Sequence, residues 1–527
     1  MAQSELGQTM TVRLAELVAA LSLGVDLGFG QPMEHVLRQC MIALRLAERI
    51  GLDDEQRSVV YYTALLVNVG CHSDAHEQAK WFGDDIALKS GKYDHELRSL
   101  RAAAASLRLI GAGNPPLHRF RVGLEFVLSG HREVEGMIEQ HAALAGTLAA
   151  QLGLSRAVQD AVAASYEQWD GRGWPGRLAG ESIPVAARLA QLAEFVEVAH
   201  RVGGVDAASA LAARRAGTQF DPALAALVHG DPEAILVGLD STGAWDTVIA
   251  AEPALSGSLS DDGVDAALLA IANFVDLKSP FTLGHSRAVA ELAVDSGARL
   301  GLPADEQRML RRAGFVHDLG RLGVSNAIWD KPGPLGHGEW ERVRMHPYLT
   351  ERMLHQSRAL APLAEIAVQH RERLDGSGYP RALSGSAISP PARLLGAVDA
   401  YQSMIEPRPH RPARSAADAA AELRKDVAAG RLDADAVEAV LAAAGHRVGR
   451  RRDRPAGLTA RELDVLRLLA RGLSAKEIAT RLVITPKTAR NHIEHIYAKI
   501  ETSNRVRACM FAVQHGLIPE DAASPER

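Results

Sequence analysis

The sequence predicts an all-α protein in which two tandem helical repeats precede a small, basic C-terminal helical domain. Ala and Leu, which have the highest helix propensities, dominate long stretches, whereas Phe, Trp and Tyr together make up only 5% of the residues. Two further observations define the organisation: an internal repeat and an excess of basic charge near the C-terminus. The length of 527 residues agrees with several domains, because a single core rarely grows beyond about 250 residues.

The composition, with 47% hydrophobic and 23% charged residues, is typical of globular proteins. No long uncharged apolar run occurs, because the closest candidate, residues 12–30, is interrupted by Arg13, Glu16 and Asp26. The N-terminus lacks a basic patch followed by an apolar stretch, and the three cysteines are odd in number and widely separated. We therefore expect a cytoplasmic protein with reduced thiols and no membrane partner, rather than a secreted disulfide-rich protein.

Basic charge is concentrated near the C-terminus. Residues 446–519 contain 15 Lys and Arg against 6 Asp and Glu, a net charge of +9, which leaves −14 for the rest of the chain. This asymmetry predicts that only the C-terminal part approaches a polyanion.

Two linkers are expected from composition. One is the basic segment 446–457, and the other is the segment 252–263, which is rich in Ser, Gly, Pro and Asp. The predicted organisation is a first repeat at 1–250, a second repeat at 260–445, a basic linker at 446–457 and a C-terminal domain at 458–520.

The internal repeat is visible as motifs that recur at fixed spacing. Residues 169–175 match residues 374–380 at an offset of 205, whereas residues 66–70 match residues 316–320 at an offset of 250. Because each offset is kept across more than one motif, chance similarity between Ala- and Leu-rich helices is a poor explanation. The difference between the offsets predicts an insertion of 45 residues in the first copy, within 72–130.

The second repeat contains six side chains that are typical of metal ligands, namely His285, His317, Asp318, His346, His370 and Asp399. Apolar periodicity around them predicts helices over 286–300, 306–318, 339–354, 360–369 and 393–404. Imidazole and carboxylate together suit Mn, Fe, Zn or Ni better than Ca. The adjacent His317 and Asp318 are informative, because an aspartate has two oxygens and can bridge two ions roughly 3.5–4 Å apart. A single histidine of this kind is usually only capped or exposed, but six ligands in this order favour a metal site.

This repeat resembles the HD-GYP domain, a group of HD-superfamily phosphohydrolases associated with hydrolysis of cyclic di-GMP. The matching segments are 282–286, 316–320, 329–335, 339–347, 370–380, 399–401 and 408–412. The resemblance implies one ion held by His285, His317, Asp318 and Asp399, with Asp318 bridging to a second ion held by His346 and His370. It implies two divalent ions, Fe or Mn in preference to Zn or Ni. It also implies catalytic roles for Asp318 and Arg321 and substrate-binding roles for Arg321, Arg371 and Tyr379.

Three positions depart from that family. The chain has His370-Arg371 where the family has a pair of histidines, and Phe281 where members with a third metal have Glu. Arg321 replaces the family's Lys, which keeps a cation for phosphate but changes a point charge into a planar fork. The resemblance therefore implies two metal ions and no third, and it leaves open whether a cyclic dinucleotide is hydrolysed or only bound.

The first repeat lacks most of these ligands. Its corresponding residues are His35, Val67, Asn68, His141, Ser165 and Glu194. Without a bridging carboxylate, two cations would lie close together with uncompensated charge, so no binuclear site is expected here. We expect a structural or dimerising repeat; a sensor that binds a ligand without turnover and an unrelated helical domain are the alternatives.

The C-terminal domain contains short helical periods separated by turn signals. Thr459 and Glu462 form a capping box that begins the first helix, and Ser474–Glu477 repeats this pattern before the second. Pro486 is acceptable in the first turn of a third helix, whose outer face is expected to be polar and basic. Two short helices joined by a tight turn, with a polar second helix, are typical of a helix-turn-helix.

This segment resembles the LuxR/GerE-type C-terminal DNA-binding domain in residues 458–462, 472–479, 485–492, 497–500 and 505–518. The resemblance implies double-stranded promoter DNA as a partner. The candidate DNA-binding residues are Lys476, Thr485, Lys487, Thr488, Arg490, Asn491 and Lys499. Of these, Lys487, Arg490 and Asn491 are expected at bases or nearby phosphates. Such domains usually bind as dimers through the last helix, so a homodimer is expected, with Val506, Met510 and Val513 as candidate contacts.

The leading hypothesis is a DNA-binding transcriptional regulator of LuxR type. Its input would be the metal-dependent phosphohydrolase domain, which acts on or senses a cyclic dinucleotide such as cyclic di-GMP. A second hypothesis is chiefly a phosphodiesterase that the helix-turn-helix only localises, and a third is a non-catalytic scaffold. The complete ligand set favours an enzyme over a scaffold, whereas Arg321, Arg371 and the degenerate first copy favour sensing over fast turnover.

Overall fold

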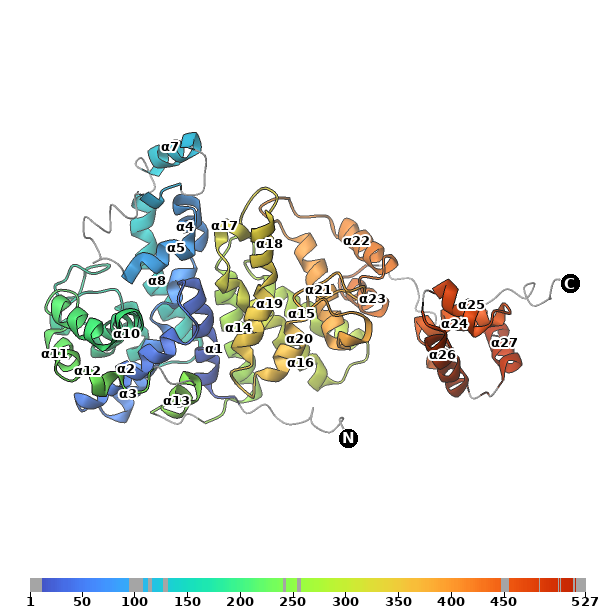
Figure 1. Ribbon diagram of the computed structural model, residues 1–527, viewed down its shortest axis with the longest axis horizontal. Coiled ribbons are helices and arrows are strands. Elements are labelled where there is room, and N and C mark those ends of the chain that lie inside the picture. Colours follow the sequence, from blue (N-terminus) through green and yellow to red (C-terminus); the bar gives the residue numbers. More distant parts are fainter. Residues whose placement is uncertain are drawn as a thin grey trace. The chain divides into compact units, whose positions relative to one another are not determined.

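The computed structural model describes residues 12–93, 108–111, 116–126, 131–239, 243–253, 257–446, 455–482, 484–500, 502, 504–514 and 517. All regular elements in these ranges are helices, and the only other pairing among them is three isolated β-bridges, which confirms the predicted all-α class (Figure 1). The chain divides into two compact units, Met1–His446 and Arg447–Arg527. Among the described helices, none has the length and apolar character needed to cross a membrane.

The first repeat is built around the long helix α10. Its helices are α1 (Leu14–Gly28), α2 (His35–Arg49), α3 (Asp54–Leu66), α8 (His131–Gln151), α9 (Arg156–Ala163), α10 (Val185–Arg215), α11 (Pro222–Gly230), α12 (Pro232–Leu236) and α13 (Ala244–Ala250). Helix α10 packs against α2, α3 and α11, and α8 packs against α9. Leucines on α1 and α2, such as Leu17 and Leu37, are fully buried in this core. The short 3-10 helix η1 (Val69–His72) follows α3 and packs on α8.

The second repeat follows the same plan. Its helices are α14 (Asp261–Asp276), α15 (His285–Arg299), α16 (Ala304–Val316), η5 (Leu319–Gly323), α17 (Asn326–Trp329), α18 (His337–Arg344), α19 (His346–Leu354), α20 (Ala361–Ala367), α21 (Pro390–Ile405), α22 (Ala416–Ala428) and α23 (Ala434–Ala443). Helix α15 packs against α16, α21 and α23, and η5 packs on α19. The repeats agree in backbone detail, because Glu34 and Gly284, which precede α2 and α15, both have φ of +76°.

One predicted helix is wrong in its extent. The sequence predicted a single helix over 339–354, whereas the structure has α18 ending at Arg344 and α19 beginning at His346. The reason is Pro347, which has no N–H to donate to the carbonyl oxygen of Val343. That oxygen instead accepts a hydrogen bond of 2.6 Å from the His346 ring. The break therefore positions a candidate metal ligand.

The insertion in the first repeat supplies helices that contact the second repeat. It contains α4 (Ala75–Phe82), α5 (Asp85–Ser90), η2 (Gly91–Tyr93) and α7 (Pro116–Glu125). Helix α4 packs against α17, and His76 on α4 pairs with Asp330 at 2.8 Å. Trp81 and Phe82 form a small core with Ile110 and Val122. Much of this insertion therefore folds as an arm that joins the two repeats (Figure 1).

The C-terminal unit contains four described helices, α24 (Ala460–Ala470), α25 (Ala475–Leu482), α26 (Pro486–Lys499) and α27 (Arg505–Gln514). The predicted capping box is present, since Thr459 accepts from the backbone N–H of Glu462 and the Glu462 side chain accepts in return. Leu466, Ile478, Ala489 and Ile496 are among the buried residues of its core. Most of the predicted basic linker, residues 447–454, lies outside the described residues.

Candidate metal centre and adjoining cleft

The six predicted metal ligands lie at or near helix ends in the second repeat, and all are buried. His285 begins α15, His317 and Asp318 follow α16, His346 begins α19, His370 follows α20 and Asp399 lies within α21. The close packing that brings η5 onto α19 depends on Gly320, because a Cβ there would lie 1.9 Å from the carbonyl oxygen of His346. The equivalent Gly70 of the first repeat has the same relation to His141, at 2.1 Å. Both repeats therefore form the same cradle.

The structure brings these six side chains together. Two groups have ligand atoms within 4.8 Å of one another: His285, His317 and Asp318, and then Asp318, His346 and His370. Asp399 belongs with the first group, since its Oδ1 lies 3.3 Å from Nε2 of His285 and 3.9 Å from Nε2 of His317. Asp318 is shared between the groups, as a bridging carboxylate would be.

Hydrogen bonds fix which ring nitrogen of each histidine faces the centre. Nδ1 of His317, His346 and His370 donates to the carbonyl oxygens of Gly314, Val343 and Ala367, at 2.8, 2.6 and 2.6 Å. Nδ1 of His285 lies 2.8 Å from the Glu406 carboxylate. Each Nε2 therefore faces the centre, the arrangement found in proteins whose histidines bind metals.

Unpartnered buried atoms indicate that the centre is built to bind something. His317 Nε2 and Asp318 Oδ1 are buried without a hydrogen-bond partner, and each such atom costs roughly 1–3 kcal/mol. Burial lowers the pKa of His346 to about 3 and that of His370 well below its usual value, so these rings are neutral, as ligands must be. For His285, burial is outweighed by the carboxylates of Asp399 and Glu406, which raise its pKa to about 9. This donor set fits divalent cations, which would displace that proton.

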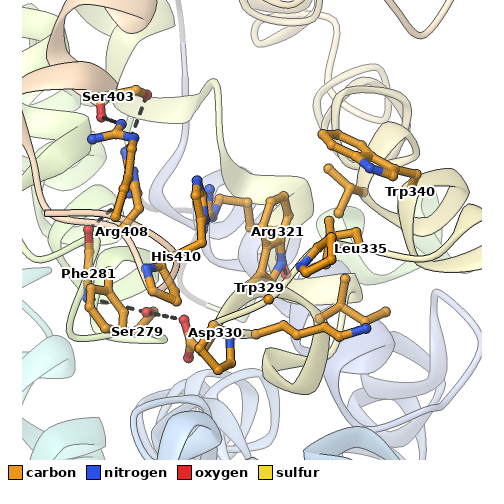
Figure 2. A pocket seen from close by; sticks show the side chains of 18 of the residues that line it. Ser279, Phe281, Arg321, Trp329, Asp330, Leu335, Trp340, Ser403, Arg408 and His410 are labelled. Atoms are coloured by element: carbon orange, nitrogen blue, oxygen red, sulfur yellow. Dashed lines mark hydrogen bonds between the residues drawn. The ribbon is translucent and has the colours of Figure 1, made fainter.

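A cavity of about 630 Å³ opens beside the centre, with His346 in its wall (Figure 2). Its cations are Arg321, Lys331, Arg371, Arg408 and Arg411, and its aromatic rings are Phe281, Trp329, Trp340, Tyr379 and His410. The Arg321 guanidinium stacks 3.8 Å from the Trp329 ring centroid and lies 3.4 Å from Asp318. The cleft therefore combines positive charge with flat apolar faces beside the candidate metal ligands.

Two arginines already neutralise the carboxylates of the centre. Arg371 lies 3.2 Å from Asp399, and Arg321 contacts the Asp318 oxygen that faces away from His346 and His370. Glu406, the partner of His285, was missed by the sequence analysis; it is the extended residue that directly follows the last residue of α21, the helix that carries Asp399. The predicted substrate residues Arg321, Arg371 and Tyr379 all line the cavity.

In the first repeat, a lysine ammonium group lies among the residues that correspond to the candidate metal ligands of the second repeat. The Lys92 ammonium donates to Asn68 at 3.0 Å and to Glu194 at 2.7 Å, the residues that correspond to Asp318 and Asp399. Tyr93 and Asn68 also donate to the same oxygen of Glu194, at 2.9 and 2.7 Å. Lys92 comes from the insertion, so the sequence of the other repeat gave no sign of it.

We expect Lys92→Met to destabilise the protein by roughly 3–5 kcal/mol, because it leaves the buried Glu194 carboxylate without a counter-ion. Urea unfolding of the full chain, followed by tryptophan fluorescence, measures the change. Lys425→Met, an exposed substitution on α22, is the matched control. Adding Glu194→Gln to Lys92→Met is expected to restore part of the loss, and wild-type stability of the single variant would contradict the role of Lys92.

In the C-terminal unit, most of the predicted DNA-binding side chains are exposed. Exposed residues are Lys476, Thr485, Lys487, Arg490, Asn491 and Lys499, whereas Thr488 is half-buried and its N–H donates to Thr485. Lys499 also pairs with Glu462 at 2.7 Å within the unit. Of the candidate dimer contacts, Met510 is 56% exposed, and the side chains of Val506 and Val513 lie outside the described residues.

Comparison with protein families agrees with this geometry. The HD domain family matches residues 131–224 and 270–436, which lie in the first and second repeats respectively. The luxR family of bacterial regulatory proteins matches residues 456–512.

Individual relatives are cyclic dinucleotide phosphodiesterases. The 3'3'-cGAMP-specific phosphodiesterase 3 of Vibrio cholerae is 31% identical over 76% of this chain and 88% of its own. A crystal structure of a Vibrio cholerae cyclic GMP-AMP-specific phosphodiesterase superposes with a TM-score of 0.57 and 27% identity, over 82% of this chain and 97% of that one. A cyclic di-GMP phosphodiesterase of Pseudomonas aeruginosa is 35% identical over 30% of this chain and 40% of its own. The chain thus belongs to the HD-GYP group of metal-dependent HD-domain phosphohydrolases and carries a C-terminal domain of the luxR family.

Proposed function

We propose that the second repeat hydrolyses a cyclic dinucleotide with two resident divalent ions. The observation that carries this proposal is the position of the six candidate ligands beside a cavity lined by arginines and aromatic rings. A cyclic dinucleotide has two anionic phosphodiesters and two flat bases, and this lining offers partners for both. The cavity volume of about 630 Å³ lies within the usual range for small-molecule sites.

The first substrate to consider is 3'3'-cGAMP, with cyclic di-GMP as the alternative. The relative that matches over 88% of its own length is named for 3'3'-cGAMP, whereas the relatives named for cyclic di-GMP match over shorter segments. We assign the base-stacking role to Trp340, which is 45% exposed, and to the ring of Tyr379. Trp329 is already covered by Arg321 and is therefore a support rather than a stacking surface.

The side chains have distinct roles in the reaction that we propose. When bound, two divalent ions supply positive charge that polarises the phosphoryl group and makes water a better nucleophile. Asp318, Asp399 and the four histidines would hold these ions, and Asp318 is the residue common to both ligand groups. Arg321, which Trp329 keeps in place, directs its guanidinium at the charge that develops on the phosphate. Glu406 and the three backbone carbonyls keep the histidine rings oriented throughout.

The test is hydrolysis of 3'3'-cGAMP and of cyclic di-GMP by the full chain, supplied with Mn or Fe without oxygen. We expect a linear dinucleotide product that disappears when a chelator removes the metal. Trp340→Ala is expected to raise KM more than it lowers kcat, because stacking acts on bound substrate. Two bound ions with tight nucleotide binding and no product would overturn hydrolysis and favour the sensor alternative.

We further propose that the C-terminal domain binds promoter DNA, as a homodimer in the cytoplasm, and that occupancy of the cleft alters this binding. The support is the row of exposed polar and basic side chains on α26, with Thr485 capping its N-terminus. A phosphodiesterase that the domain only localises remains the second candidate. DNA affinity measured with and without a non-hydrolysable cyclic dinucleotide separates the two, because localisation alone predicts no change.

Arg490→Ala is expected to weaken binding to a selected DNA site by about 1–3 kcal/mol, or roughly 5- to 150-fold. Arg490 is exposed on α26, where a guanidinium can meet a base edge or a phosphate. The measurement is fluorescence anisotropy of the full chain with a duplex selected from a random pool. Arg471→Ala is the matched control, because Arg471 is an exposed arginine at the end of α24, outside both α26 and the last helix. Equal affinities of the two variants would argue against α26 as the reading helix.

A further inference from the structure

The first repeat contains a second buried polar cluster that the proposed function does not use. Cys71 lies on η1, at the position corresponding to Arg321, and its Sγ is 3.5 Å from Nδ1 of His141 on α8. Nε2 of the same ring contacts the carboxylate of Asp74, the residue that precedes α4. A thiol, an imidazole and a carboxylate are therefore in series, the order in which proteins activate a nucleophile.

The charges that face Cys71 favour the thiolate. Burial alone would raise the pKa of Cys71, but His141 and Lys92 lower it, and the Tyr166 hydroxyl lies 2.7 Å from the sulfur. For His141, burial is outweighed by Cys71 and Asp74, which raise its pKa to about 9. The remaining acid nearby, Glu194 on α10, is paired with Lys92 and so does not oppose the thiolate. These contacts favour an ion pair between the Cys71 thiolate and the His141 imidazolium.

Cys40 shows how different an ordinary buried thiol in the same repeat is. It is fully buried on α2, its thiol donates to the carbonyl oxygen of Tyr61 at 3.7 Å, and burial alone raises its pKa. Cysteines in such apolar surroundings are inert, whereas those beside cations react as thiolates. The cluster around Cys71 is thus not a consequence of burial.

We propose that Cys71 is a modification site at which small hydroperoxides oxidise the thiolate, with His141 as the proton donor and Asp74 as the positioning residue for its ring. Cys71 is only 7% exposed, which restricts the reaction to small reactants. The sulfur attacks one peroxide oxygen, so that an S–O bond forms as the O–O bond breaks. The sulfur loses two electrons and the peroxide gains them, and the departing hydroxide takes the proton of His141 as water. The product is a sulfenic acid beside a neutral histidine.

The experiment treats the full chain with hydrogen peroxide, traps sulfenic acid with dimedone and measures labelling of each cysteine by peptide mass spectrometry. Cys40 is the internal control for burial and Cys509, half-buried on α27, is the control for an accessible thiol. We expect Cys71 to be labelled at least ten times faster than Cys40. Between pH 8 and pH 6 its labelling rate should fall by clearly less than the roughly 75-fold expected for a thiol with a pKa near 8.5. A Cys71 rate equal to that of Cys40 would overturn the proposal.

Two variants separate activation from packing. Asp74→Asn keeps the shape but removes the charge that orients the His141 ring, and we expect a slower rate with a steeper pH dependence. Tyr166→Phe removes a hydrogen bond to sulfur and is expected to slow labelling to a smaller degree. Labelling in guanidinium serves as the reference for a chain without structure, in which the three cysteines should react alike. An unchanged rate and pH profile in Asp74→Asn would contradict the assigned role of the carboxylate.

Discussion

Asp318→Asn is expected to lower kcat/KM for cyclic dinucleotide hydrolysis by at least about 1000-fold, which corresponds to roughly 4 kcal/mol. Asp318 is the one residue common to both ligand groups of the described centre, with Oδ1 lying 3.5 Å from His346 Nε2 and 3.8 Å from His370 Nε2. An amide has the same shape but is neutral and offers a single oxygen, so it cannot bridge two cations. The substitution gives the second repeat an asparagine at the position where the first repeat has Asn68.

Metal content distinguishes this explanation from a simple loss of folding. We expect fewer than two ions per chain in Asp318→Asn by elemental analysis, with a circular dichroism spectrum like that of the wild type. Glu341→Gln, the same acid-to-amide change at an exposed position on α18, should retain two ions and full activity. Two ions per chain in Asp318→Asn, together with undiminished turnover, would show that Asp318 does not bridge.

The clustering of the six candidate side chains was predictable because most of them lie at helix ends that the sequence marks. The rings of His317, His346 and His370 are each oriented by a hydrogen bond to the carbonyl oxygen three residues earlier in the chain. Such a contact is local, so spacing and the resemblance to a known family were sufficient to name the six side chains that the structure brings together. Prediction from periodicity was wrong at Pro347. The apolar pattern continues across this residue, but the helix breaks there because proline has no backbone N–H to donate.

Residues that act through distant contacts could not be found in this way. Lys92 is 102 residues from Glu194 in the chain, and Asp85 is 240 residues from Ser325. Lys92 and Asp85 both lie in the insertion of the first repeat, and the second repeat has no corresponding segment. Periodicity reports which face of a helix is buried and says nothing about which charged group it meets across the core.

The two repeats neutralise a buried carboxylate at the same position with different cations. A buried carboxylate at the position of Asp399 or Glu194 needs a cation, since an isolated buried charge costs far more than folding can supply. In the second repeat Arg371 provides this charge to Asp399, and in the first repeat Lys92 provides it to Glu194. Loss of metal ligands in the first copy is therefore compatible with retention of the fold, and this explains how the copy persists as a partner of the second.

Asp85, which is fully buried at the start of α5, lies at the contact between the two repeats. Its Oδ2 pairs with Lys89 at 3.1 Å and Lys278 at 3.5 Å, and its Oδ1 accepts from the Ser325 hydroxyl and the Asn326 N–H. We expect Asp85→Asn to lower the free energy of unfolding by roughly 3–5 kcal/mol, because two buried ammonium groups lose their counter-ion. Since Asn326 begins the short helix that ends in Trp329, KM for the nucleotide should also rise.

The pH dependence of this loss identifies its cause. Burial already lowers the pKa of Lys278 to about 8, below the value in an unfolded chain, and removing Asp85 lowers it further. A lysine with a depressed pKa destabilises the fold while it is protonated, and this penalty decreases as the pH rises from its folded pKa towards its higher unfolded pKa. The difference between wild type and Asp85→Asn in urea unfolding should therefore narrow from pH 7 to pH 9.5. Asp84→Asn, one residue earlier, is the matched control, because asparagine caps α5 as well as aspartate does and its stability should stay within about 0.5 kcal/mol of wild type. A loss in Asp85→Asn that is the same at both pH values would place the cause in packing rather than in the buried charges.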